Sequence, residues 1–283
     1  MKYAEVKRSP RAVANPRRAS IRLTDRDLWL LEGLAKMRFL TTGQLAKLYF
    51  DGSRWSANKR LRKLLDAGHL KAWVRSLSEE NVYSITRSGI KAIENGNVEL
   101  PLETKMPHGL DGNLEHLLII NDVRTSLVSD LPEVGGEIVW WRSDWELRSH
   151  GRERIIPDGL FLIKWQSLKE QAYALEADNN TRSSRNFMRK ILAYASFQNR
   201  GHGIYGIPDP IILVGCSDRK WMERYRVCIK QLRSNRRVWF ATIEEIKREG
   251  ATGAIWANGE ERKYSLRELT LCPYRKDKCD DES

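Results

Sequence analysis

The sequence of 283 residues predicts a mixed α/β protein in two parts, a small basic part followed by a larger domain with a mixed sheet. Residues 1–100 hold 20 Lys and Arg against 10 Asp and Glu, a net charge of +10, whereas residues 101–283 add only +2. Short amphipathic helices come first, and apolar strands alternating with helices follow. Gly, Pro and Asn are frequent in residues 94–113, so the domain boundary is expected there.

The first part shows three helical patterns and two short extended runs. The predicted helices cover residues 25–37, 41–50 and 53–68, and the extended runs cover residues 70–75 and 81–89. Thr24 and Ser53 stand where N-caps are expected, and Gly68 follows the third helix. Three helices followed by a hairpin predict an N-terminal winged helix-turn-helix.

The third predicted helix has an apolar stripe and a basic face. Leu61, Leu64 and Leu65 form the stripe that is expected to be buried. The residues expected to contact DNA are Arg54, Ser56, Lys59, Arg60 and Lys63. With the positive charge of residues 1–100, they predict double-stranded DNA as the partner. Two alternatives stay open: a winged helix whose basic face is only solvated, and an adaptor without a nucleic acid partner.

The second part reads as an α/β domain. Helices are expected at 113–131, 184–199, 219–234 and 244–250, and strands at 136–149, 154–165, 171–180, 210–216 and 236–243. The run "PIILVGC" is apolar throughout, which is typical of a strand buried on both faces of a parallel sheet. The order of these elements predicts a mixed sheet flanked by helices.

Three carboxylates stand at the ends of two of these strands. Asp158 opens the run "PDGLFLI", and Glu176 and Asp178 close "YALEAD". If the two strands pair antiparallel, Asp158 and Glu176 meet at one end of the sheet, and Asp178 shares a face with Glu176. Carboxylates so close together repel one another unless they are protonated or bridged by a cation. The sequence therefore predicts a site for Mg²⁺ or Mn²⁺, which could activate water against a phosphodiester.

This pattern resembles the PD-(D/E)XK nucleases, and the resemblance implies a restriction-endonuclease-like mixed-sheet domain. It places Pro157 and Asp158 on one strand, Glu176 on the next, and Glu115 on the preceding helix. Asp178 stands where the family has a lysine, and Lys190, one turn before Tyr194, is the candidate replacement. The alternative for Lys190 is an ordinary exposed lysine beside a half-buried tyrosine.

A second residue could provide the carboxylate that the pattern places on the helix. Asp122 lies seven residues after Glu115, on nearly the same helix face, and could serve instead. His116 could carry a proton or be structural. The five His residues are never closer than eight residues in the sequence, which argues against a His-x-His metal site.

The chain also resembles the replication-relaxation family and the related mobilisation relaxases of the restriction-endonuclease-like class. The resemblance rests on the winged helix, "LEHLLIINDV", "PDGLFLI", "LEADNNT" and "RKILAYASF", over about residues 24–257. It implies a double-stranded DNA-binding protein of plasmid or mobile-element replication or conjugation, with an origin-nicking endonuclease activity. The alternative is a non-catalytic initiator accessory or transcriptional repressor with a degenerate nuclease-like domain.

These inferences divide the chain into five segments. They are a flexible basic arm at 1–20, the winged helix-turn-helix at 21–97, a linker at 98–112, the nuclease-like domain at 113–270 and a C-terminal tail at 271–283. No run approaches the roughly 18 apolar residues of a membrane span, and no apolar signal core is present, so we expect a cytoplasmic protein. Other replication or relaxosome proteins are expected partners, and a homodimer stays open.

Overall fold

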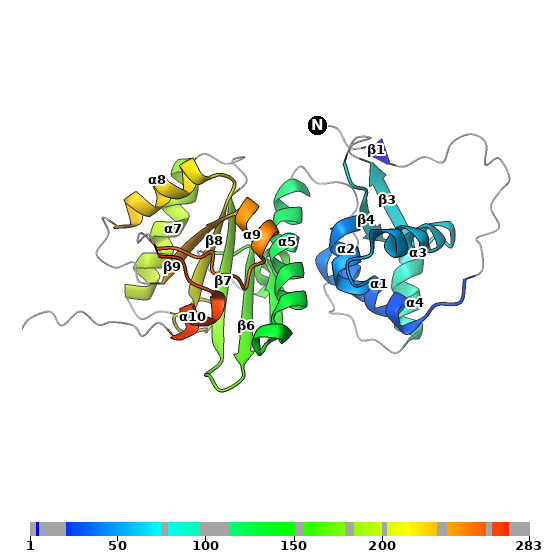
Figure 1. Cartoon of the computed structure of the whole chain (residues 1–283), viewed down its shortest axis with the longest axis horizontal. Coiled ribbons are helices and arrows are strands. Elements are labelled where there is room, and N and C mark those ends of the chain that lie inside the picture. The colour runs from blue at the N-terminus through cyan, green and yellow to red at the C-terminus, as the bar shows by residue number, and fades with distance from the viewer. Residues whose placement is uncertain are drawn as a thin grey trace, which may run out of the picture. The chain divides into compact units, whose positions relative to one another are not determined.

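The computed structural model describes residues 4–5, 21–74, 79–96, 114–150, 155–178, 184–199, 203–230, 237–258 and 262–271 (Figure 1). Over these ranges the protein is of mixed α/β class. It divides into two compact units, Met1–Asn121 (unit 1) and Asp122–Ser283 (unit 2), each of which is described by itself. The linker expected at 98–112 lies outside the described residues.

Unit 1 consists of helices and a small antiparallel sheet. Its helices are α1 (Asp25–Met37), α2 (Thr42–Tyr49), α3 (Arg54–Asp66) and α4 (Arg87–Asn95), and its strands are β1 (Ala4–Glu5), β2 (Leu40–Thr41), β3 (Leu70–Val74) and β4 (Val82–Ile85). The strand order is β1-β3-β4-β2. The three helices and the β3–β4 hairpin therefore follow one another as predicted. Within residues 1–20, predicted as a flexible arm, Ala4–Glu5 pairs antiparallel with β3, and the remaining residues of this segment lie outside the described residues.

The helices of unit 1 begin where the sequence provides a cap. At the start of α1, the backbone N–H and the hydroxyl of Thr24 both donate to Asp27 Oδ2 at 2.7 Å. At the start of α2, Thr41 and Gln44 form the reciprocal pair of a capping box. The predicted stripe of α3 is partly confirmed, because Leu61 and Leu64 are fully buried whereas Leu65 is half-buried.

Unit 2 is a five-stranded sheet with helices on both faces. The unit contains the second half of α5 (Leu114–Asp130), then β5 (Gly136–Ser143), α6 (Asp144–His150), β6 (Gly159–Trp165), β7 (Gln171–Asp178), α7 (Ser184–Asn199), β8 (Ile211–Cys216), α8 (Arg219–Lys230), β9 (Val238–Thr242), α9 (Ile243–Glu249) and α10 (Leu266–Leu271). A single 3-10 turn, Pro132–Val134, precedes β5.

The sheet runs in the order β5-β6-β7-β8-β9. Strands β5, β6 and β7 pair antiparallel, whereas β7, β8 and β9 pair parallel. The predicted mixed sheet and the predicted antiparallel pairing of the second and third strands are confirmed. One face of the sheet packs against α7 and α8 through a core that includes Phe187, Tyr194 and Tyr225. The other face carries α9, because a Cβ at Gly215 would point at Ile243 and Ile246.

Two helices of unit 2 were missed in the sequence. The run 136–149 was predicted as one strand, but β5 ends at Ser143 and α6 begins, with the Glu146 carboxylate accepting from the Ser143 N–H at 2.6 Å. Helix α10 starts in the same way, with Glu268 accepting from the Ser265 N–H at 2.7 Å. Both starts carry the Ser-x-x-Glu pattern of a capping box, "SDWE" and "SLRE", so a sequence signal was present.

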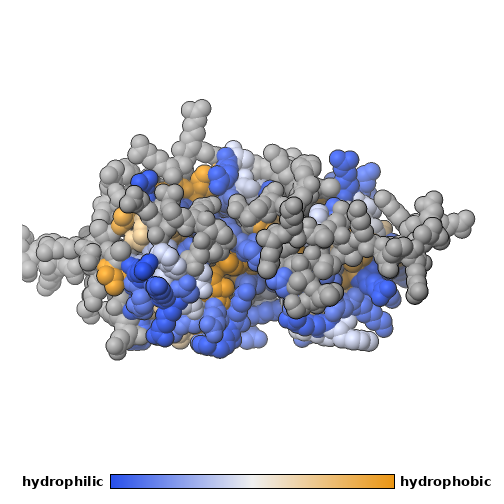
Figure 2. Space-filling view, turned by 90° about the horizontal axis from the view of Figure 1, so that it is seen from above, coloured by the Kyte–Doolittle hydropathy of each residue, from blue (hydrophilic) through white to orange (hydrophobic). Residues whose placement is uncertain are grey.

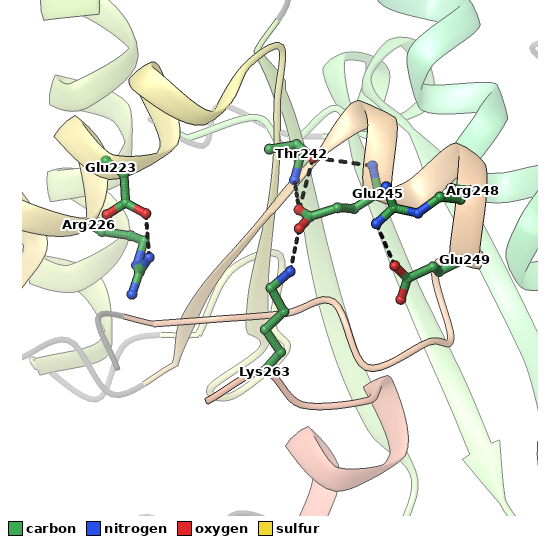
Figure 3. A network of polar contacts seen from close by, with 7 residues as sticks. All are labelled: Glu223, Arg226, Thr242, Glu245, Arg248, Glu249 and Lys263. Carbon is green, nitrogen blue, oxygen red and sulfur yellow. Dashed lines mark hydrogen bonds and ion pairs between the residues drawn. The ribbon is translucent and has the colours of Figure 1, made fainter. Parts of the chain in front are cut away.

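A polar network fixes the turn from β9 into α9 (Figure 3). Glu245 Oε2 accepts from the N–H and the hydroxyl of Thr242, each at 2.9 Å, and Oε1 pairs with Lys263. Burial raises the pKa of Glu245, but the bonds from Lys263 and Thr242 outweigh it and hold the pKa below its usual value. The network ties residues 262–264 to the end of the sheet.

The coloured surface in Figure 2 is mainly hydrophilic, with small and separate hydrophobic patches. Among the described residues, no helix combines the length and the apolar character that crossing a bilayer requires.

Candidate functional site

The register of β6 and β7 places Asp158 opposite Glu176. Gly159 pairs with Leu175, and the Asp158 N–H donates to the Leu175 carbonyl at 3.0 Å, so the pairing continues to residue 158. The Ala177 N–H donates to Asp158 Oδ2 at 2.9 Å and holds this carboxylate against β7. Asp158 is 7% exposed and Glu176 1%. The two carboxylates thus meet at one end of the sheet, as the sequence predicts.

Gly159 allows this end of the sheet to pack closely. A Cβ at Gly159 would lie 2.5 Å from the ring of Trp141 in β5, a distance at which one of the two must move. The Trp141 ring stacks on Phe161 with centroids 4.6 Å apart, and Phe161 stacks on Tyr173. The strand that follows Asp158 is therefore held by an aromatic stack across β5, β6 and β7.

Lys190 of α7 joins the two carboxylates. Its Nζ lies 2.6 Å from Glu176 Oε2 and 3.9 Å from Asp158 Oδ1. The lysine side chain is 21% exposed, more than either carboxylate. The structure thus brings together Asp158, Glu176 and Lys190, although the lysine comes from a helix instead of the strand position 178.

Tyr194, one turn after Lys190, donates its hydroxyl to Glu176 Oε1 at 2.5 Å. Burial raises the pKa of Glu176, the Lys190 charge lowers it, and the Asp158 charge raises it, leaving the pKa at about 8. Burial, with the neighbouring Glu176, also raises the pKa of Tyr194 well above its usual value, so its hydroxyl keeps its proton. The site is therefore a buried carboxyl group held by one lysine and one phenol.

Asp178 lies on the same face of β7 but has a different partner. Tyr225 of α8 donates its hydroxyl to Asp178 Oδ2 at 2.7 Å. Burial and the bond to Asp178 raise the pKa of Tyr225. In the described part of the chain, no group of three or more His, Cys, Asp or Glu side chains is placed to hold a metal ion. The three carboxylates of the sequence prediction therefore separate into a pair with Lys190 and a single residue with Tyr225.

The two helical candidates belong to different units. Glu115 is in the first turn of α5 and belongs to unit 1. Asp122, the second choice, belongs to unit 2, where its Oδ2 lies 3.1 Å from Nζ of Lys247 in α9. Because α9 covers the other face of the sheet from α7, Asp122 is not placed with Asp158 and Glu176.

The pair of carboxylates fits a hard divalent cation. Mg²⁺ is often held by one or two carboxylates together with phosphate oxygens of a substrate, and Mn²⁺ accepts the same oxygen donors. Asp158 and Glu176 provide such oxygens from adjacent strands, and Lys190 shows that a positive group is accommodated between them. These two side chains would hold the ion.

In unit 1, the exposed face of α3 differs from the predicted one. Seven residues of this helix are exposed: Arg54, Trp55, Asn58, Lys59, Arg62, Lys63 and Asp66. Of the predicted contacts, Arg54, Lys59 and Lys63 lie on this face. Ser56 is half-buried and accepts a hydrogen bond from the Ser53 hydroxyl at 3.0 Å. Arg54 pairs with Glu80, whose other oxygen accepts from the Gly43 N–H at 2.8 Å.

Arg60 is turned toward the interior of unit 1. Its Nε donates to Asp27 Oδ1 at 2.7 Å, a second nitrogen pairs with Oδ2, and the same nitrogen donates to the Arg22 carbonyl at 3.1 Å. Burial raises the pKa of Asp27, but the bonds from Arg60 and Thr24 outweigh it and hold the pKa below its usual value. Arg60 therefore fixes α3 to the start of α1.

Four exposed residues of α3 were absent from the predicted set: Trp55, Asn58, Arg62 and Asp66. The Trp55 side chain is 73% exposed, and Lys59 Nζ lies 4.9 Å from its ring centroid. Trp55 was not predicted as a surface residue because tryptophan side chains are usually buried to a large extent. The signal that could have found it is helical spacing, because residues 55, 58, 59 and 62 lie opposite the stripe of Leu61 and Leu64.

Three comparisons with known proteins were made. A family model described as replication-relaxation matches residues 31–206, which is more than half of the chain. Comparison with curated proteins and with solved structures found no match.

Proposed function

The chain belongs to the replication-relaxation family, and from this premise we propose that it binds double-stranded DNA and cleaves one strand in a metal-dependent reaction. Family membership indicates a role in replication or mobilisation. The finer proposal is that the protein acts on plasmid or mobile-element DNA, with unit 1 as a winged helix-turn-helix and unit 2 as a PD-(D/E)XK-like nuclease. The observation that carries it is the convergence of Asp158, Glu176 and Lys190.

The order of strands in unit 2 supports a nuclease-like domain. Three antiparallel strands, β5 to β7, are followed by parallel β8 and β9, with α7 crossing over from β7 to β8. Asp158 precedes the second strand and Glu176 lies two residues before the end of the third, which are the positions that the PD-(D/E)XK pattern gives to its carboxylates. Lys190 supplies the amine that the pattern expects two residues after Glu176.

Each residue of this site has a separate role in the proposed reaction. A bound Mg²⁺ or Mn²⁺ would supply an activated water and neutralise the charge that develops on the phosphate. Asp158, fixed by the Ala177 N–H, and Glu176, fixed by Tyr194, would hold the ion. The ammonium of Lys190, the most exposed of the three ionisable groups, is placed to hold a phosphate oxygen or the attacking water.

DNA binding by unit 1 is supported by the charge of its exposed surface. Residues 1–100 have a net charge of +10, and the exposed face of α3 presents four basic residues, Arg54, Lys59, Arg62 and Lys63. A surface of this kind attracts the phosphate backbone, and its affinity falls as salt rises. Arg60 is left out of the proposed interface because Asp27 holds it.

The test of cleavage is a nicking assay on supercoiled plasmid with Mn²⁺ or Mg²⁺. We expect an open-circular product from the wild type, and its loss in Asp158→Asn and in Lys190→Met. Lys164→Met is the matched control, because Lys164 is an exposed lysine of β6 that pairs with Glu137. The proposal is wrong if the wild type leaves the plasmid supercoiled, or if Asp158→Asn nicks as fast as the wild type.

A second candidate is a non-catalytic DNA-binding protein, such as an initiator accessory or a repressor. The observation that favours it is the burial of Glu176, whose two oxygens are held by Tyr194 and Lys190. In this case the ion pair would serve only the fold of unit 2. Salt-dependent DNA binding without any nicking by the wild type would support this candidate.

A further inference from the structure

The exposed face of α3 carries a side chain that charge alone does not explain. The Trp55 indole is 73% exposed in the first turn of the helix, whereas Leu61 and Leu64 of the same helix are fully buried. Tryptophan is enriched at binding interfaces because its ring is apolar and its N–H is polar, and the basic residues around Trp55 favour an anionic partner. Double-stranded DNA has both apolar and anionic groups, in its base edges and its phosphates.

The spacing on α3 puts one amide beside this indole. Trp55, Asn58, Lys59 and Arg62 follow one another at i, i+3, i+4 and i+7, so they lie along one side of the first two turns. Lys59 lies over the Trp55 ring, 4.9 Å from its centroid, which orders the indole at the surface. The N-terminal turns of a recognition helix are the part that reaches base edges in the major groove.

We propose that this face recognises an A·T step in double-stranded DNA, with Asn58 bonded to adenine and Trp55 packed on the thymine methyl group. The proposal rests on the DNA-binding function proposed above and names the sequence feature that is bound. An asparagine amide offers one donor and one acceptor, which match N7 and the amino group of adenine. The thymine methyl is the apolar group of the major groove, and the exposed indole is its complement.

The basic residues of the same face have a different task. Lys63 and Arg62 lie one to two turns further along α3, and Arg54 stands at its start. Charged side chains on both sides of the base-contacting pair are suited to phosphates, which position a protein without reading sequence. Replacement of these residues should weaken binding to all duplexes alike.

The experiment begins with selection from a pool of randomised duplexes by the full-length wild type, Trp55→Ala and Asn58→Ala. The selected wild-type duplex is then prepared with uracil for thymine, which removes the methyl, or with 7-deazaadenine, which removes N7. We expect each change to weaken wild-type binding about 10-fold. Trp55→Ala should bind the uracil duplex as tightly as the normal duplex. Asn58→Ala should bind the 7-deazaadenine duplex as tightly as the normal duplex.

Controls separate the outcomes. Trp29→Ala removes the other strongly exposed tryptophan of unit 1, 60% exposed on α1, and should keep both responses. Salt-dependent binding with equal affinity for the normal and modified duplexes overturns this inference and leaves DNA binding intact. The same holds if Trp55→Ala and Asn58→Ala keep the wild-type responses. Failure of the wild type to retain any duplex at low salt overturns the proposed DNA binding as well.

Discussion

Nζ of Lys190 lies 2.6 Å from Oε2 of Glu176, which joins the middle of α7 to the end of β7. The same helix brings the Tyr194 hydroxyl to the other oxygen of this carboxylate. Two residues along β7, Asp178 is held by Tyr225 of α8 instead. One strand thus presents two buried carboxylates to two helices, and this arrangement allows the chemistry at Glu176 to be tested against a matched position.

The first prediction concerns the two tyrosines. Tyr194→Phe leaves Glu176 Oε1 without its phenol donor, and Tyr225→Phe does the same to Asp178 Oδ2. Each should lower the free energy of unfolding by about 1–3 kcal/mol, the cost of a buried acceptor that loses its partner. Urea unfolding measures this loss. Nicking should fall in Tyr194→Phe and stay near the wild-type rate in Tyr225→Phe; equal nicking by the two variants would contradict a special role for Glu176.

The second prediction concerns pH. The pKa of Glu176 is about 8 in the folded protein, above the usual 4.5 of a glutamate, because burial disfavours the charged form. The folded state therefore binds this proton more tightly than the unfolded state does, and the stability that it contributes is present below about pH 4.5 and is lost as pH rises toward 8.

Glu176→Gln should remove this dependence. Each unit of pKa difference corresponds to about 1.4 kcal/mol, so the wild type should lose several kcal/mol relative to Glu176→Gln between pH 5 and pH 8. Urea unfolding of both proteins across this range measures the difference, with the exposed Glu137→Gln as the control. Parallel pH profiles for wild type and Glu176→Gln would show that the carboxyl is not perturbed.

The third prediction separates Arg60 from Lys59, which adjoin in sequence. Arg60→Ala removes the partner of the buried Asp27 and should lower the free energy of unfolding by about 3 kcal/mol. Lys59→Ala removes an exposed cation and should leave stability within about 0.5 kcal/mol of the wild type while weakening DNA binding. Thermal unfolding and a salt titration of duplex binding measure the two effects. If Arg60→Ala is as stable as the wild type but binds DNA more weakly, Arg60 contacts DNA and the prediction is wrong.

The fourth prediction concerns Gly159. A Cβ there would lie 2.5 Å from the Trp141 ring, so Gly159→Ala should displace the ring or β6 and cost about 1–3 kcal/mol. Gly215→Ala is the matched control on the same sheet, because its Cβ would meet Ile243 and Ile246 at an ordinary 3.5 Å. Near-ultraviolet circular dichroism should change in the first variant and not in the second. Equal stability of the two variants would show that the Trp141 ring moves aside without lowering the free energy of unfolding.

Much of the fold follows from periodicity and capping. The antiparallel pairing that joins Asp158 to Glu176 was predictable, because strand alternation and a short connection leave few registers. The position of Lys190 was predictable as a candidate, since only a basic residue on a nearby helix could replace the lysine absent at 178. The mixed α/β class was predictable from the order of the elements.

Other features depend on tertiary packing, which a single sequence does not display. The pairing of Asp178 with Tyr225 depends on how α8 is rotated against the sheet. Arg60 and Lys63 lie within one turn of each other, and only the position of Asp27 on α1 decides which of them turns inward. Trp55 is of a residue type usually found in the core, but its side chain is exposed, and the sequence alone does not show this.

The placement of Lys190 on a helix also changes what determines the distance between Lys190 and Glu176. A lysine two residues after a glutamate on one strand is held by the pleat of that strand. Here the distance depends on how Ile191, Tyr194 and Phe187 seat α7 against the sheet. Since each residue of a helix turns by about 100°, one residue inserted in α7 before Lys190 would carry its ammonium away from Glu176. Apolar substitutions beneath α7 can therefore tune this centre while every charged group in it stays unchanged.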